Sequence, residues 1–76
     1  EKQKIKQDSI QIGENIRALR KARGIGTELV RMLQLSGTAM TRETLVKIER
    51  AVQHLQATQL RAIRDALQVS YDDLLK

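Results

Sequence analysis

Residues 41–50 read Thr-Arg-Glu-Thr-Leu-Val-Lys-Ile-Glu-Arg, and this stretch is the most informative part of the sequence. Side chains three and four positions apart share one face of an α-helix. Leu45 and Ile48 therefore turn inward together, while polar and charged side chains project from the opposite face. The hydroxyl of Thr41 suits an N-cap, and Met40 with Leu45 fits a hydrophobic staple. The pattern predicts a short amphipathic helix that begins at about Thr41.

A longer helix is expected before this stretch, over residues 10–23. Asp8 or Ser9 suits its N-cap, and Gly24 suits its carboxyl end because glycine readily takes the left-handed conformation found there. The apolar residues of this segment recur at four- and three-residue steps, as in a buried helical stripe. They are Ile12, Ile16 and Leu19.

A second helix is expected over residues 27–36. Thr27 is its predicted N-cap, and the carboxylate of Glu28 is favourable in its first turn. Gly37 is expected to close it. The residues that should turn inward are Leu29, Val30 and Leu33.

Two more helices are expected after a linking segment at residues 51–56. The first covers residues 57–67. The second is short and starts at Ser70, which can cap it while Asp73 completes a capping box. The residues that the longer helix should bury are Leu60, Ile63 and Leu67.

The composition agrees with an all-α domain. The chain of 76 residues has no proline and a single aromatic residue, Tyr71, whereas helix-favouring residues are abundant. Strand signals are missing. A chain of this length forms one small domain. We therefore expect a compact five-helix bundle over residues 10–76, preceded by a basic, flexible tail at residues 1–9.

The charge favours an anionic partner. Lys and Arg number 14 against 9 Asp and Glu, which gives a net charge of +5 and a pI of about 10.1. Such a balance is typical of proteins that bind nucleic acid or an acidic membrane surface, although solubility explains it equally well.

Several features are missing from the sequence. The chain has no cysteine, no run of about 18 apolar residues and no signal-peptide pattern. We expect a soluble, cytoplasmic protein with no membrane partner. Enzyme activity is not expected, because there is no Cys nucleophile, no paired His and Asp, and no Gly-rich phosphate loop. No cofactor, metal or small-molecule ligand is expected either.

Four segments carry a resemblance to a known family. They are Ile-Gly-Glu-Asn-Ile-Arg-Ala-Leu-Arg-Lys-Ala-Arg-Gly at 12–24, Glu-Leu-Val-Arg-Met-Leu at 28–33, Thr-Arg-Glu-Thr-Leu-Val-Lys-Ile-Glu-Arg at 41–50 and Ala-Leu-Gln-Val-Ser-Tyr-Asp-Asp-Leu-Leu at 66–75. In this order and spacing they resemble the helix-turn-helix domain of the Xre or Cro-type phage-repressor family. The resemblance implies a lambda repressor-like bundle whose motif consists of the second and third helices.

The function that the resemblance implies is sequence-specific binding of double-stranded DNA by a transcription regulator, favoured as a repressor. Members of this family act as homodimers on palindromic operators, with half-sites about 34 Å apart. In such proteins the second helix of the motif enters the major groove. Here that reading helix is residues 41–50.

Base contacts are implied for the exposed side chains at the start of the reading helix. They are Arg42, Glu43, Val46 and Lys47. Arg42 and Lys47 can donate to guanine, whereas Glu43 can accept from cytosine N4. Val46 offers methyl groups to thymine. The alternative is a solvated face, whose exposed ion pairs contribute only about 0–1 kcal/mol.

Phosphate contacts are expected at the helix starts and in the loop after the reading helix. The candidates are Thr27, Thr41, Thr44, Arg50, Gln53 and His54. His54 is the only histidine, and a solvated loop residue is favoured over a metal ligand. For the tail at residues 1–9, a solvated terminus is favoured over a basic arm along DNA.

The resemblance also implies a structural ion pair, partly buried, between Arg20 late in the first helix and Glu49 late in the reading helix. Two departures from the family pattern concern the docking geometry. Residues 35–40 lengthen the connection between the two motif helices. Residues 25–28 lack the glutamine that often opens the first motif helix and holds a phosphate.

A protein-interaction module on the same scaffold is the alternative function, as in an antitoxin-like or anti-repressor-like adaptor. Such a module would use apolar residues outside the reading face for a dimer or partner surface. They are Val52, Leu55, Tyr71, Leu74 and Leu75. Burial in the core is favoured for at least one of Leu74 and Leu75.

Overall fold

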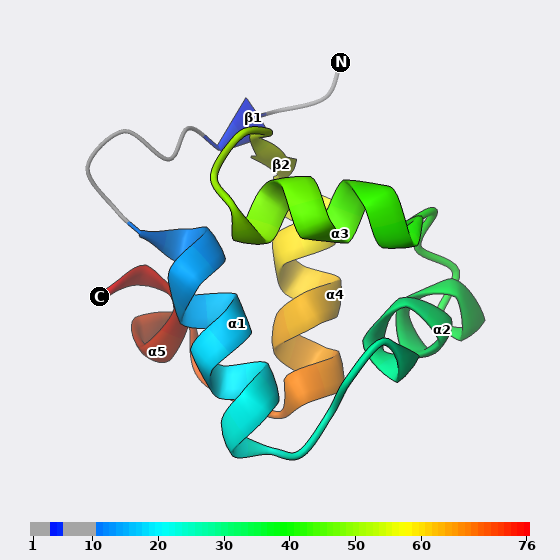
Figure 1. Ribbon diagram of the computed structural model, residues 1–76, viewed down its shortest axis with the longest axis horizontal. Helices are drawn as coiled ribbons and strands as arrows, with labels where there is room; N and C mark the ends of the chain where they lie inside the picture. Colours follow the sequence, from blue (N-terminus) through cyan, green and yellow to red (C-terminus); the bar gives the residue numbers. More distant parts are fainter. Residues whose placement is uncertain (1–3, 6–10) are drawn as a thin grey trace.

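The computed structural model of the chain describes residues 4–5 and 11–76, and five α-helices account for most of them (Figure 1). The helices are α1 (Ile12–Ala22), α2 (Glu28–Leu35), α3 (Arg42–Glu49), α4 (Ala57–Leu67) and α5 (Tyr71–Leu75). The bundle is compact, with a Cα radius of gyration of 11.1 Å. The predicted helical class and the predicted number of helices are confirmed.

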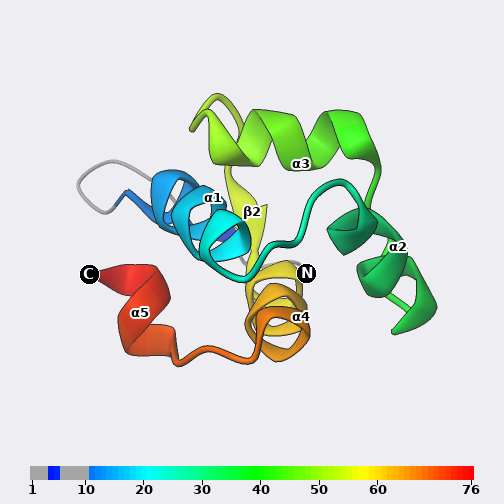
Figure 2. The ribbon, with the colours of Figure 1, turned by 60° about the horizontal axis from the view of Figure 1, so that its bottom comes forward.

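The helices pack around one core. α1 contacts α3, α4 and α5, and α2 contacts α4. In Figure 1, α3 runs across the molecule with α1 and α2 below its two ends, and Figure 2 places α5 on the side of α1 away from α3. The buried apolar side chains are Ile12, Ile16, Leu29, Leu33, Met40, Leu45, Ile48, Leu55, Leu60, Ile63, Leu67 and Leu74. The inward stripes predicted for the helices are therefore confirmed, with Leu19 and Val30 only partly buried.

Side-chain caps start α3 and α5 as predicted. The Thr41 hydroxyl oxygen accepts from the backbone N–H of Thr44 at 3.1 Å. The Ser70 hydroxyl accepts from the N–H of Asp73 at 3.1 Å, and the Asp73 carboxylate accepts from the N–H of Ser70 at 3.4 Å. These bonds satisfy donors that have no partner within the helix itself.

The predicted caps of the first two helices are wrong. Gln11 occupies the N-cap position of α1, and not Asp8 or Ser9 as predicted. The helix therefore starts later than expected, at Ile12, which is also the first residue of its buried face. Thr27 occupies the N-cap position of α2, but its side chain makes no capping bond. The backbone of Thr27 is already helical, at φ −68° and ψ −12°, whereas a capping side chain needs an extended backbone.

Left-handed residues follow four of the helices. Gly24 and Gly37 have φ of 69° and 92°, as expected for the ends of α1 and α2. Ala51 and Gln68 take φ of 60° and 56° after α3 and α4, which the sequence did not reveal. At each end the next residue donates back into the last turn, as in the bond from the Val52 N–H to the Lys47 carbonyl at 3.0 Å.

A pair of two-residue strands corrects the expectation of a chain without strands. β1 (Lys4–Ile5) runs antiparallel to β2 (Leu55–Gln56), with Ile5 opposite Leu55. β2 lies in the segment at 51–56 that was expected only to link two helices. Leu55 is fully buried and holds this segment against the core. The remainder of the predicted tail lies outside the described residues.

Candidate nucleic-acid interface

The position of α3 is set by its buried face. Leu45 is 5% exposed and Ile48 is fully buried, so this side of the helix packs on the core. Met40, just before the Thr41 cap, is buried as well, in agreement with the predicted staple. The opposite side of α3 is consequently held at the surface.

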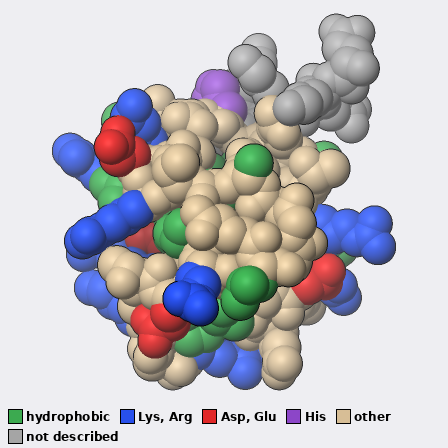
Figure 3. Space-filling model, turned by 90° about the vertical axis from the view of Figure 1, so that its right-hand side faces the viewer, with side chains coloured by type: hydrophobic (Ala, Val, Ile, Leu, Met, Phe, Trp, Pro, Cys, Tyr) green, Lys and Arg blue, Asp and Glu red, His purple; other side chains and the backbone are tan. Residues whose placement is uncertain are grey.

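The four side chains predicted to read bases all lie on the exposed side of α3. Arg42, Glu43, Val46 and Lys47 are exposed, and with Arg50 they line one shallow hollow. The apolar Val46 is 44% exposed although it neighbours Leu45. On the side of the molecule that carries α3, Lys and Arg side chains gather, at the left of Figure 3. This surface combines hydrogen-bond donors, one carboxylate acceptor and a methyl group, which are the groups that distinguish base edges.

An ion pair holds the carboxyl end of α3 to α1. Arg20 Nε donates to Glu49 Oε2 at 2.9 Å, and Arg20 Nη2 donates to Glu49 Oε1, also at 2.9 Å. The two side chains are 17% and 8% exposed. The hydrogen bonds to Glu49 raise the pKa of Arg20, against an opposing effect of desolvation, and the charges of Glu49 and Glu28 raise it further. The predicted ion pair is therefore present, and it is bidentate.

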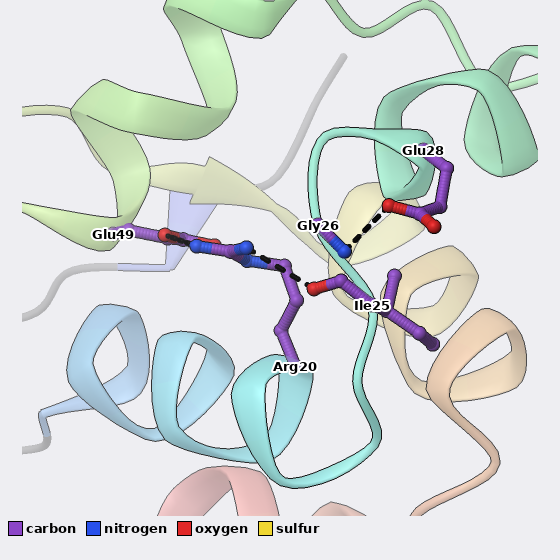
Figure 4. A network of polar contacts seen from close by, with 5 residues as sticks. All are labelled: Arg20, Ile25, Gly26, Glu28 and Glu49. Carbon is purple, nitrogen blue, oxygen red and sulfur yellow. Dashed lines mark hydrogen bonds and ion pairs between the residues drawn. The ribbon is translucent and has the colours of Figure 1, made fainter.

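The same guanidinium also reaches the segment before α2. Arg20 Nη1 donates to the carbonyl of Ile25 at 3.1 Å. Figure 4 shows Arg20 between Glu49 on one side and the Ile25–Gly26 segment on the other. One side chain thus ties the carboxyl end of α3 to the chain that enters α2.

Gly13 permits a close approach of α1 to α3. A Cβ atom at this position would lie 2.9 Å from the carbonyl oxygen of Glu49 and would overlap the carbonyl oxygen of Ile48. Real Cβ atoms do not approach backbone atoms so closely, so only glycine fits here. Gly13 was not predicted from the sequence, because an isolated glycine in a helical pattern has no distinctive signal.

Two side-chain amides that the sequence analysis did not single out join elements together. Asn15 Nδ2 donates to the Leu74 carbonyl at 2.8 Å, which connects α1 to the end of α5. Gln34 Nε2 donates to the Met40 carbonyl at 2.8 Å. The second bond spans the long connection between α2 and α3, and α2 ends at Leu35 without an added turn.

The predicted phosphate contacts differ in their surroundings. Arg50 and His54 are exposed on the loop that follows α3, where Gln53 is half-buried. The hydroxyls of Thr41 and Thr44 lie 2.9 Å apart and hydrogen-bond to each other. Thr41 and Thr44 lie at the start of α3, whereas Arg50, Gln53 and His54 follow its end, so these candidates flank the two ends of one exposed helix.

The start of α2 is different, because a carboxylate occupies it. Glu28 Oε1 accepts from the backbone N–H of Gly26 at 2.6 Å (Figure 4). The N–H groups of Leu29 and Val30 donate to the carbonyls of Gly26 and Thr27 at 3.3 and 3.1 Å. Three of the backbone donors near Thr27, those of Gly26, Leu29 and Val30, thus have partners already, and one partner is an anion.

The apolar residues considered for a partner surface divide into two groups. Leu55 and Leu74 are fully buried, so the expectation that they form a surface is wrong, and the core interpretation of Leu74 is confirmed. Val52, Tyr71 and Leu75 are 68%, 39% and 37% exposed. The Tyr71 ring lies 4.8 Å from the guanidinium of Arg64, measured to the ring centroid.

No group of three or more His, Cys, Asp or Glu side chains within residues 11–76 is placed to hold a metal ion. Among the helices that the structure describes, none has the length and apolar character needed to span a bilayer.

Comparisons with known proteins identify no relative. No protein-family model, no curated protein and no solved structure matches this chain significantly.

Proposed function

We propose that this chain is a helix-turn-helix protein of the lambda repressor-like type that binds double-stranded DNA sequence-specifically and regulates transcription as a repressor. α2 and α3 form the motif, and α3 enters the major groove. Arg42 and Lys47 donate to guanine, Glu43 accepts from cytosine, and Val46 contacts thymine methyl groups. Arg50 and the loop up to His54 contact phosphate.

The observation that carries this proposal is the division of α3 into two faces. Its inner face is anchored by Leu45 and Ile48, while its outer face exposes three cations, a carboxylate and Val46 around one hollow. Exposed ion pairs stabilise a fold by only about 0–1 kcal/mol, so this mixture contributes little to folding. A rigid helix that presents such groups is suited to reading base edges, because a misplaced donor loses its hydrogen bond.

The rigid attachment of α3 supports the same function. The bidentate pair of Arg20 with Glu49 and the close approach at Gly13 both fix the carboxyl end of the helix to α1. At the other end, Met40 is buried in the core and its carbonyl accepts from Gln34 of α2. We infer that α3 docks on DNA as a rigid unit despite the longer connection to α2. The whole protein then binds a palindromic site as a homodimer.

A protein-interaction module remains the second candidate, and exposed apolar residues favour it. Val52 is 68% exposed and Leu35 is 77% exposed, and neither belongs to the proposed reading face. Binding through such residues depends weakly on salt, whereas binding to phosphate releases counterions and weakens steeply as salt rises. Salt dependence therefore separates the two functions.

The test is selection of bound DNA from a randomised duplex pool, followed by anisotropy measurements at two salt concentrations. Wild type is compared with Arg42→Ala/Lys47→Ala and with the control Arg61→Ala/Lys76→Ala, which removes the same charge from exposed residues elsewhere. We expect wild type and control to retain one palindromic motif that the reading-face variant loses. Equal behaviour of all three proteins, with no retained motif, would overturn the proposal in favour of a protein partner.

A further inference from the structure

The start of α2 carries a contact that opposes the proposed function. In helix-turn-helix proteins the first helix of the motif crosses the DNA backbone, and helix starts favour anions. Here the Glu28 carboxylate accepts from the Gly26 N–H at 2.6 Å. A phosphate at this position meets a negative charge where the fold otherwise offers donors.

We propose that Glu28 limits the affinity of this protein for DNA by occupying and charging the start of α2. The inference rests on the proposed function. The Glu28 carboxylate competes with a DNA phosphate for the Gly26 N–H. A phosphate can accept a hydrogen bond from this N–H only after the bond to Glu28 is broken. Contacts to DNA are then made mainly through α3 and the loop after it.

The helix that carries this carboxylate belongs to the proposed motif. In both ribbon views α2 lies below the amino-terminal end of α3 (Figures 1 and 2). The charge of Glu28 also acts on Arg20, whose guanidinium is bonded to Glu49 of α3. Figure 4 shows these groups in one network. Glu28 therefore adds a negative charge to the helix that the proposed function brings against the DNA backbone, and this charge is coupled through Arg20 to α3.

Three substitutions separate charge from hydrogen bonding. Glu28→Gln removes the charge and keeps an acceptor for Gly26, Glu28→Ala removes both, and Glu28→Asp keeps the charge. Asp72→Asn is the matched control, because it changes the net charge equally in the first turn of α5. Thermal melting of each variant checks that the fold is retained.

The measurement is anisotropy of a fluorescein-labelled duplex that carries the motif selected by wild type, titrated over a series of salt concentrations. We expect Glu28→Gln and Glu28→Ala to bind about two- to fivefold more tightly than wild type. For these two variants, the slope of the logarithm of the binding constant against the logarithm of the salt concentration should become more negative by up to about one. Glu28→Asp should match wild type, and Asp72→Asn should change binding less.

Two results would overturn the inference. If wild type binds with steep salt dependence but Glu28→Gln binds no more tightly than Asp72→Asn, Glu28 does not limit affinity, and the proposed function stands. If wild type shows no salt-dependent binding to any duplex, the proposed function is overturned and the role of Glu28 is overturned with it.

Discussion

Gly13 of α1 lies against the carbonyl group of Ile48 in α3 so closely that no side chain fits between the two helices. The two residues are far apart in the sequence and lie on different helices. The contact brings α1 against the carboxyl end of α3, next to the Arg20–Glu49 ion pair. Close packing at this point therefore contributes to the position of the whole of α3.

We expect Gly13→Ala to lower the free energy of unfolding by at least about 2 kcal/mol, since overpacking against backbone outweighs the better helix propensity of alanine. The melting temperature should fall by about 4–8 °C for each kcal/mol in a domain of this size. Glu14→Ala, an exposed change on the same helix, serves as the control. A Gly13→Ala melting temperature at or above that of wild type would contradict the close contact.

Removal of Arg20 should be costly, because it leaves the nearly buried Glu49 carboxylate without its partner. For Arg20→Ala we expect a loss of about 3 kcal/mol, against about 0.5 kcal/mol or less for the exposed control Arg61→Ala. Arg20→Met/Glu49→Leu should lose less than Arg20→Ala, since it removes both charges together. Equal melting temperatures for Arg20→Ala and Arg61→Ala would exclude a structural role for the pair.

The two threonines that precede α2 and α3 should respond differently to the same substitution. Thr41→Ala removes a capping bond and should cost about 1 kcal/mol. Thr27→Ala should change stability much less, because the Thr27 side chain makes no capping bond. Urea denaturation of both variants measures the difference. A larger loss for Thr27→Ala would show that its hydroxyl caps α2 in solution.

Replacing Ala51 or Gln68, the two non-glycine residues with positive φ, by glycine should increase the stability of the fold. A non-glycine residue in this conformation costs roughly 1–2 kcal/mol, and the greater freedom of glycine in the unfolded chain offsets part of the gain. We expect Ala51→Gly and Gln68→Gly each to stabilise the fold by about 0.5–1 kcal/mol in thermal melting. Ala22→Gly, inside α1, is the control and should destabilise. Loss of stability in all three variants would argue against positive φ at 51 and 68.

Arg50 and Arg42 should affect DNA binding in different ways under the proposed function. Arg50→Ala should weaken binding to all duplexes alike and reduce the salt slope by about one. Arg42→Ala should relax selectivity at one base pair, with a loss of about 1–3 kcal/mol on the preferred sequence. Anisotropy with the selected duplex and its single-base variants distinguishes the two. If Arg50→Ala alone changed the preferred sequence, the assignment of the two roles would be reversed.

Local sequence patterns predicted the helices well. The spacing of Leu60, Ile63 and Leu67 marked the buried face of α4, and its bounds at 57–67 agree with the structure. Gly24 and Gly37 marked two helix ends because glycine is the usual residue in the left-handed conformation. Ala51 and Gln68 escaped notice because other residues adopt this conformation only when the surrounding fold requires it.

The proposed reading surface was also accessible from the sequence. Helical periodicity alone puts Arg42, Glu43, Val46 and Lys47 opposite Leu45 and Ile48, and their exposure agrees with that. Thr27 was misjudged because capping depends on backbone dihedral angles that a residue type does not determine. The strand pair was missed because two-residue strands are too short for an alternating pattern to be recognised.

Local sequence patterns were enough to predict which segments form helices, which side of each helix is buried, and which side chains of α3 reach the surface. These properties follow from interactions within a few residues, so periodicity and capping chemistry report them directly. The contact of Gly13 with Ile48 and the burial of the β2 residue Leu55 in the core became visible only in the folded structure. Each depends on the spatial position of atoms that local patterns do not encode.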